Sequence, residues 1–280
     1  MNAIKFVSLV LCSLFVVAVC GGEEPFKAPQ KEDYATAMKT VAAKFKGSPG
    51  VYIHIGDSIT YDSGNTAWAR YGEGQSSEVQ AFLKWSHRGE KNDKDGWWLA
   101  SVDVQRGRSH TAASGVQADG YLQGGKHGLP SLAEIIKKYN PQLALYMLGT
   151  NDVNASRPVA QYIADVEKAI DALLDNGTVA ILSTLPPFRG KTNKVEEYNN
   201  ALRELAIKKQ IPMIDLFAEM KARAGDDMEK AYLDNDGIHL NGPGAGPATE
   251  DNLKKIGTLL RCYLAVNKGM EIKAKVFSAK

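Results

Sequence analysis

The feature that most constrains the fold of this chain is an alternation of short apolar runs with longer segments of helical periodicity. Most of the runs are rich in β-branched residues or leucine, as buried strands are. They span residues 51–55, 100–104, 143–148, 179–182 and 212–216. Apolar residues recur at helical spacing over 159–174, 195–205 and 253–264. This alternation predicts βαβ units and a largely parallel sheet of about five strands, covered by helices on both faces.

Length and composition allow one sizeable core. The chain has 280 residues, of which 44% are hydrophobic and 24% are charged, which excludes a wholly disordered or fibrous protein. The formal net charge of +2 gives no case for nucleic-acid binding, which needs a concentrated basic surface. No repeat or change of composition divides residues 27–266, so we expect a single domain there. The lysine-rich stretch 267–280 lacks a pattern and is expected to be a solvated tail.

The first residues have the order of a secretory signal. Lys5 precedes an apolar run over 6–20, and Gly21 and Gly22 follow it. The run is shorter than the roughly 18 residues of a membrane-spanning helix, so we expect a signal peptide over 1–20 and a secreted or periplasmic protein without membrane integration. A membrane anchor, a buried N-terminal helix and a lipid-modified Cys20 are the alternatives. Removal of the signal leaves Cys262 as the single cysteine, which is expected to pack as a small apolar residue.

Polar segments follow four of the apolar runs. Ligands collect at the carboxyl ends of the strands in a parallel sheet, so residues just beyond the strands matter most for function. The segments are Gly-Asp-Ser-Ile-Thr at 56–60, Ala-Ser-Gly at 113–115, Gly-Thr-Asn-Asp at 149–152 and Asp-Gly-Ile-His at 236–239. Each is ordinary loop chemistry alone, but their joint placement indicates one site at one edge of the sheet.

Together these segments could perform acyl transfer, which needs a nucleophile, a base, a group that orients the base, and donors for an oxyanion. Ser58 can present its hydroxyl at the sheet edge, and His239 can act as a neutral imidazole base. Asp236, three residues earlier, can hold the imidazole in the required tautomer. The backbone N–H groups of Ser58 and Gly115 and the side-chain amide of Asn151 are the candidate oxyanion donors.

The four blocks resemble those of the SGNH (GDSL-type) hydrolases. The serine block is Gly56–Thr60, the glycine block is Ser114-Gly115, the asparagine block is Gly149–Asp152, and the last block is Asp236–His239. The resemblance spans about residues 51–264. It implies a three-layer α/β/α, flavodoxin-like fold and hydrolysis of O-acyl or thioester bonds through an acyl-enzyme, with no metal and no cofactor. It also assigns the same roles to Ser58, Asp236, His239, Gly115 and Asn151, and makes Asp57 and Asp152 residues that shape their turns.

An aromatic-rich insertion over residues 61–99 follows the serine block and contains all four tryptophans. Since it leaves directly from the nucleophile turn, we expect it to cover the active site. Trp68, Trp97 and Trp98 are then candidates for a platform on which sugar rings stack. The alternative is that these rings and Trp85 form the small core of a cap.

Within the enzyme class, the export signal and the aromatic insertion favour a carbohydrate O-acetyl esterase whose partner is a small acyl ester or an acetylated saccharide. A lipid or short-chain acyl esterase or thioesterase is the main alternative. A non-catalytic carbohydrate-binding module on the same fold is a further one, because fold alone does not establish function. No histidine has the spacing of a metal site.

Overall fold

The computed structural model describes residues 34–86 and 96–277. The chain divides into two units, Met1–Lys31 and Glu32–Lys280, and every element named below belongs to the second. The expected signal over residues 1–20, including Cys20, lies outside the described residues. Within the described ranges, no helix has the length and apolar character needed to cross a membrane.

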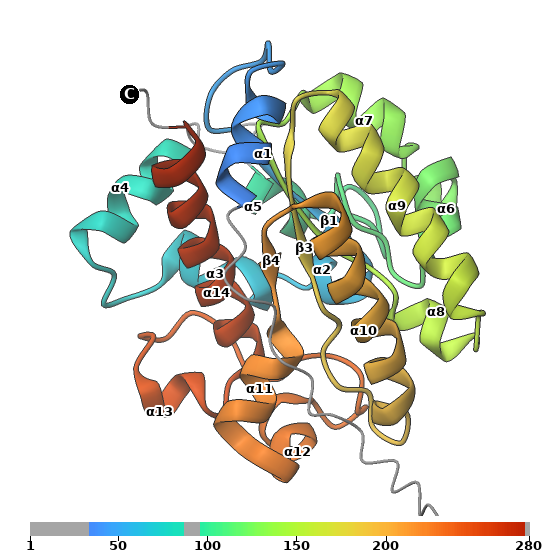
Figure 1. Ribbon diagram of the computed structural model, residues 1–280. Helices are drawn as coiled ribbons and strands as arrows, with labels where there is room; N and C mark the ends of the chain where they lie inside the picture. Colours follow the sequence, from blue (N-terminus) through green and yellow to red (C-terminus); the bar gives the residue numbers. More distant parts are fainter. Residues whose placement is uncertain (1–33, 87–95, 278–280) are drawn as a thin grey trace, which may run out of the picture. The chain divides into compact units, whose positions relative to one another are not determined.

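A parallel sheet of four strands forms the centre of the second unit (Figure 1). The strands are β1 (Tyr52–Gly56), β2 (Leu143–Met147), β3 (Val179–Ser183) and β4 (Met213–Ile214), and they lie side by side in that order. In register, Tyr52 lies beside Leu143, and Leu143 beside Val179. Every residue of β1, β2 and β3 is buried, which explains why these strands read as continuous apolar runs.

The strand predicted over residues 100–104 is wrong, so the sheet has four named strands where about five were expected. Ala100 and Ser101 end helix α5 (Gly96–Ser101), and Val104 bonds back to Arg108 in a tight turn that leaves its side chain 42% exposed. The run contains only two β-branched residues, and its first half continues the buried helical face of α5. Beside β1, the fifth position is reduced to one parallel bridge between Gly56 and Ala112.

Helices form two groups. In one, α6 (Ala118–Gln123), α7 (Leu132–Tyr139) and α10 (Thr192–Lys209) contact α9 (Val159–Asp175); in the other, α1 (Tyr34–Ala42) and α14 (Gly257–Ile272) contact η3 (Lys273–Phe277). Both groups contact the sheet, which lies between α14 on one side and α9 and α10 on the other (Figure 1). This is the α/β/α layering that the alternation predicted.

The shorter elements lie mainly in the connections. They are α2 (Ser58–Tyr61), α3 (Gly64–Tyr71), α4 (Ser77–Ser86), η1 (Lys126–Gly128), α8 (Thr150–Asn154), α11 (Leu216–Ala224), η2 (Gly225–Asp227), α12 (Met228–Tyr232) and α13 (Glu250–Leu253). The helical patterns over 159–174 and 195–205 are confirmed by α9 and α10. The pattern over 253–264 is divided between α13 and α14, because the chain turns extended at Ile256.

The C-terminal tail and the aromatic-rich insertion both differ from what the sequence predicted. The solvated tail expected from residue 267 is wrong for the described residues, because α14 runs to Ile272, whose side chain is fully buried, and Val276 in η3 is buried as well. The insertion packs its helices α3 and α4 against α14, and α5 against β1, so most of it lies beside the sheet, while α3 and α5 also contact the serine helix α2. Cys262 is buried on α14, as expected.

Candidate active site

The serine turn begins where β1 ends. Gly56 is the last residue of the strand, and a Cβ there would lie 2.0 Å from Oγ1 of Thr60 and 2.6 Å from the carbonyl oxygen of Met147, so only glycine fits. Asp57 caps α2 by accepting a 3.0 Å hydrogen bond from the N–H of Ile59. This cap makes Ser58 the first residue of a one-turn helix and places it at the carboxyl edge of the sheet.

Ser58, His239 and Asp236 form a continuous chain of hydrogen bonds. Nε2 of His239 lies 2.8 Å from Oγ of Ser58, and Nδ1 lies 2.5 Å from Oδ2 of Asp236. Oδ1 of Asp236 accepts from the N–H groups of Ile238 and His239, at 2.9 and 3.0 Å. When Nδ1 donates to Asp236, Nε2 is left as the acceptor for the Ser58 hydroxyl.

The environment of Asp236 keeps its carboxylate charged. Burial raises its pKa, but the hydrogen bonds from His239 and from the two backbone N–H groups outweigh burial and lower the pKa to about 2. The side chain is still 48% exposed. Asp236 is therefore an anion over the whole neutral range, as required of a group that orients an imidazole.

The glycine and asparagine blocks meet the serine turn. Nδ2 of Asn151 donates to Oδ2 of Asp57 at 3.2 Å and to the carbonyl oxygen of Val116 at 3.1 Å. Gly115 has φ of +73°, a conformation that favours glycine, and it is exposed at the same edge. The structure thus brings Asn151 against neighbours of both Ser58 and Gly115. The Asn151 amide, a candidate oxyanion donor, is engaged with these two protein acceptors in the free protein.

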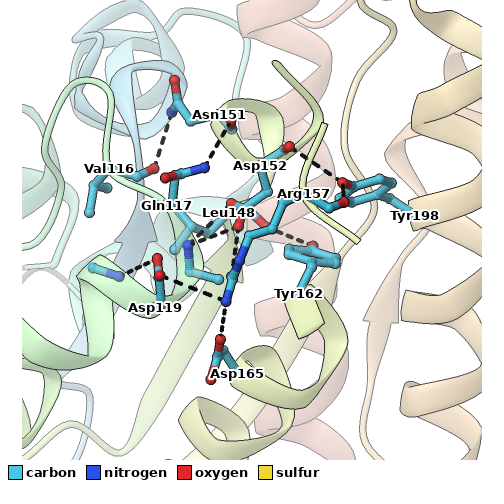
Figure 2. Close-up of polar contacts among 12 residues, drawn as sticks. Val116, Gln117, Asp119, Leu148, Asn151, Asp152, Arg157, Tyr162, Asp165 and Tyr198 are labelled. Atoms are coloured by element: carbon cyan, nitrogen blue, oxygen red, sulfur yellow. Dashed lines mark hydrogen bonds and ion pairs between the residues drawn. The ribbon is translucent and has the colours of Figure 1, made fainter. Parts of the chain in front are cut away.

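Asp152 ties the asparagine turn to the glycine loop (Figure 2). Its buried carboxylate accepts from the N–H of Ala118, at 3.1 and 3.4 Å, and from Nη1 of Arg157 at 3.0 Å. Arg157 also contacts the carboxylates of Asp165 and Asp119. Burial raises the pKa of Asp152, and the Arg157 bond offsets only part of that rise. Asp152 therefore shapes its turn as expected, through a network around Arg157 that the sequence pattern did not reveal.

Two further charged groups lie beneath the serine turn. Burial raises the pKa of Asp57 to about 6, although the Ile59 bond and the charges of His239 and Arg261 oppose the rise. The buried guanidinium of Arg261 donates to Oγ1 of Thr60 at 2.9 Å, while its Nη1 has no hydrogen-bond partner among the described residues. The one available signal for Arg261 was a charged residue within the apolar pattern of α14.

A cavity of about 460 Å³ opens beside Ser58 and His239. Its other lining residues all have polar side chains; they are Tyr61, Asp62, Ser63, Ser101, Asp103 and Ser114. No group of three or more potential metal-binding side chains occurs in the part of the chain that the structure describes. The lining residues other than Ser58, Ser114 and His239 could not be identified from the sequence, because short loop residues carry no periodicity.

The expectation of a tryptophan platform is wrong. Trp68 and Trp97 are 2% and 0% exposed, and the Trp97 ring packs edge-on against Tyr52 in the core, 5.2 Å between ring centroids. Trp98 is half-buried and does not line the cavity. The guanidinium carbon of Arg70 stacks over its ring, 3.8 Å from the ring centroid. Trp68 packs against Tyr263 of α14 and Trp97 against Tyr52 of β1, so these two rings form part of the core and not an open surface.

Comparison with known proteins agrees with this geometry. The sequence model of the GDSL-like Lipase/Acylhydrolase family matches residues 54–246, which include all four polar blocks. No curated protein matches the chain. Among solved structures, a carbohydrate esterase family 3 from Talaromyces cellulolyticus is similar, with a TM-score of 0.53 and 18% identity over 81% of this chain and 99% of that one.

Two other similar structures are described by related names. A GDSL-like lipase from Bacteroides thetaiotaomicron has a TM-score of 0.48 and 15% identity, over 87% of this chain and 97% of that one. A lipase/acylhydrolase from Enterococcus faecalis has a TM-score of 0.48 and 19% identity, over 82% and 98%. The family model spans more than half of the chain and includes the serine turn, so this protein belongs to the GDSL-like Lipase/Acylhydrolase family and is a hydrolase of ester bonds.

Proposed function

We propose that this protein is a serine esterase that removes acetyl groups from a carbohydrate through an acyl-enzyme. The observation that supports the chemistry is the hydrogen-bond chain from Asp236 through His239 to Ser58 at the wall of an open cavity. Ser58 would be the nucleophile, His239 the general base and then acid, and Asp236 the group that orients the imidazole.

The reaction proceeds in two halves. Oγ of Ser58 attacks the ester carbonyl carbon while Nε2 of His239 accepts the hydroxyl proton, and the resulting imidazolium is stabilised by Asp236. The imidazolium then returns the proton to the departing alcohol oxygen, which leaves Ser58 acylated. A water molecule, deprotonated by His239, attacks the acyl carbon and releases the acid and free Ser58.

The oxyanion of each tetrahedral intermediate needs donors placed in advance. The backbone N–H groups of Ser58 and Gly115 are proposed for this role, together with the amide of Asn151. Since that amide bonds Asp57 and Val116 in the free protein, we expect one of these bonds to be exchanged for the bond to the oxyanion.

Polar lining supports a carbohydrate ester over a lipid ester. A long acyl chain needs an apolar wall, because burying it against hydroxyl and carboxylate groups would leave those groups without partners. The cavity is lined by hydroxyl, carboxylate and imidazole side chains. A similar fold in a carbohydrate esterase family 3 from Talaromyces cellulolyticus supports this part of the proposal. Export through the segment 1–20 would place the enzyme where polysaccharides occur.

The test is acetate release from a panel of acetylated polysaccharides, run beside p-nitrophenyl esters of increasing chain length. We expect release from at least one polysaccharide and a steep decline beyond short acyl chains. Ser58→Ala should abolish both activities and labelling by an organophosphonate ester, whereas Ser63→Ala, in the same cavity, should still be labelled. Full labelling of Ser58→Ala, or a preference for long acyl chains, would refute the proposal.

A further inference from the structure

We infer that the cavity beside Ser58 selects an uncharged, hydroxyl-rich alcohol, and that Asp62 and Asp103 are the residues that recognise it. The inference rests on the proposed deacetylation and specifies its substrate: an acetylated neutral sugar with free hydroxyl groups near the ester, as opposed to an acidic sugar or an anionic lipid headgroup. It rests on the charge and the hydrogen-bonding capacity of the cavity wall.

The charges on the wall have one sign. Asp62 and Asp103 contribute carboxylates, and no Lys or Arg side chain lines the cavity. Neither carboxylate forms an ion pair within 4.0 Å in the described ranges 34–86 and 96–277. An anionic group brought to this wall would therefore meet two negative charges.

Each carboxylate uses one oxygen to hold the wall in place. Oδ1 of Asp62 accepts from the N–H of Gly64 at 2.8 Å, and Oδ1 of Asp103 accepts from the hydroxyl of Tyr61. These bonds fix the side chains at the start of α3 and across the loop after α5. The second oxygen of each remains available as an acceptor, and sugar hydroxyl groups are donors that carboxylates bind strongly.

The remaining lining favours hydroxyl groups over a cationic alcohol. The hydroxyls of Ser63 and Ser114 can both donate and accept, which matches the dual character of sugar hydroxyls. That of Tyr61 donates to Asp103, and that of Ser101 donates to the carbonyl oxygen of Trp97 and accepts from Arg70. A quaternary ammonium group binds through several aromatic faces, and Tyr61 supplies the one benzenoid ring of this lining. Cations lie nearby but outside the lining: Arg70 is stacked on Trp98, and Lys126 lies beside Gly115.

The experiment compares two acetate esters that differ in one charge. The substrates are a monoacetylated methyl glucoside and the corresponding methyl glucuronide, and the readout is the ratio of their kcat/KM values within each protein. We expect the wild type to prefer the glucoside by about tenfold or more. Asp62→Asn and Asp103→Asn should each reduce this ratio about three- to tenfold, the scale expected for removing one charge several ångström from another. Because the ratio is internal, losses that affect both substrates equally cancel.

Two controls make the result specific. Asp175→Asn removes an exposed carboxylate at the end of α9, away from the cavity, and should leave the ratio unchanged. In the wild type, raising the salt concentration should increase glucuronide turnover relative to glucoside turnover, which needs no variant to fold. Equal turnover of the two esters by the wild type, a ratio unaffected by both cavity substitutions, or a preference for a choline ester would overturn this inference alone. Hydrolysis of p-nitrophenyl acetate without any hydrolysis of sugar esters would instead overturn the proposed deacetylation, and this inference with it.

Discussion

The ion network around Arg157 makes a prediction whose size can be worked from the structure. Arg157→Met removes the cation that bonds Asp152 and Asp165, whose side chains are 0% and 12% exposed. Asp165 keeps its bond to Lys168 at 2.8 Å, so it loses little. Asp152 keeps only the N–H of Ala118, and its unpaired buried charge should dominate the loss.

We expect Arg157→Met to lower the free energy of unfolding by about 2–3 kcal/mol at pH 7. Removing one partner of a fully buried pair costs about 3–5 kcal/mol, and a hydrogen bond to a charged group about 1.5–3 kcal/mol. The expected loss lies at or below the lower end of the range for a fully buried pair, because the Arg157 side chain is itself 15% exposed. For a chain of this size the change corresponds to a fall in Tm of about 5–10 °C.

The loss should depend on pH in a defined direction. Burial already raises the pKa of Asp152 in the folded protein, and removal of Arg157 should raise it further. A carboxyl whose folded-state pKa lies above its unfolded value destabilises the fold when ionised, that is, as pH rises through the folded pKa. The destabilisation should therefore be larger at pH 7 than at pH 5, because the lower pH favours the protonated, uncharged form of Asp152 in the variant.

Urea unfolding at both pH values provides the measurement. Arg223→Met is the matched control: its side chain is 19% exposed, close to that of Arg157, but its partners Glu219 and Glu250 are 44% and 71% exposed. The control should cost less than about 1 kcal/mol. Adding Asp152→Asn to Arg157→Met should recover part of the loss. Equal losses at the two pH values, together with strict additivity in the double variant, would refute the reasoning.

Three further predictions concern the site and the insertion. Asn151→Ala should lower kcat by about 10²–10³-fold with a smaller effect on KM, as loss of an oxyanion donor does; a change in KM alone would make Asn151 a binding residue. Asp236→Asn should lower kcat throughout about pH 5–9, because a pKa of about 2 keeps Asp236 charged in the wild type at every pH in that range; the stabilisation that Asp236 provides above its ordinary pKa should disappear only as pH falls toward 2 in acid-unfolding curves. Trp97→Ala should cost about 3–5 kcal/mol of stability and reduce turnover of a sugar ester and p-nitrophenyl acetate alike, so a substrate-selective loss with unchanged Tm would show that its ring contacts sugar.

The central strands and long helices could be predicted because each buries a continuous face, which appears in the sequence as an apolar run or as apolar residues at helical spacing. The strand prediction over 100–104 was wrong because the two valines are typical of a strand, whereas Leu99 and Ala100 belong to helix α5. Burial of Trp97 could not be predicted either, because the same aromatic composition fits a sugar platform and a core. Which of these it becomes depends on what packs against it.

The meeting of Ser58 with Asp236 and His239 was predictable from order and placement, since strand exits converge at one edge. Arg157 was not predictable, because nothing in its local sequence marks it as buried, and Arg261 was marked only by its place within the apolar pattern of α14. Their partners Asp152 and Thr60 are brought to them by the tertiary fold. The sequence therefore indicated the candidate reacting groups but not the two buried arginines, Arg157 and Arg261, that bond to the loops carrying those groups.

The position of α5 has a consequence for how the protein behaves at high concentration. β1 lies at the edge of the sheet, and a bare edge strand can pair with another chain. Gly96 lies so close to β1 that a Cβ there would be 1.1 Å from the carbonyl oxygen of Tyr52, and Thr111 donates its hydroxyl to the carbonyl oxygen of His54. The start of the helix and one side chain thus occupy hydrogen-bonding positions along the outer edge of the strand that leads to Ser58. A larger residue at position 96 would push α5 away and leave that edge open to intermolecular β-sheet formation, so resistance to aggregation depends on a glycine far from the reacting atoms.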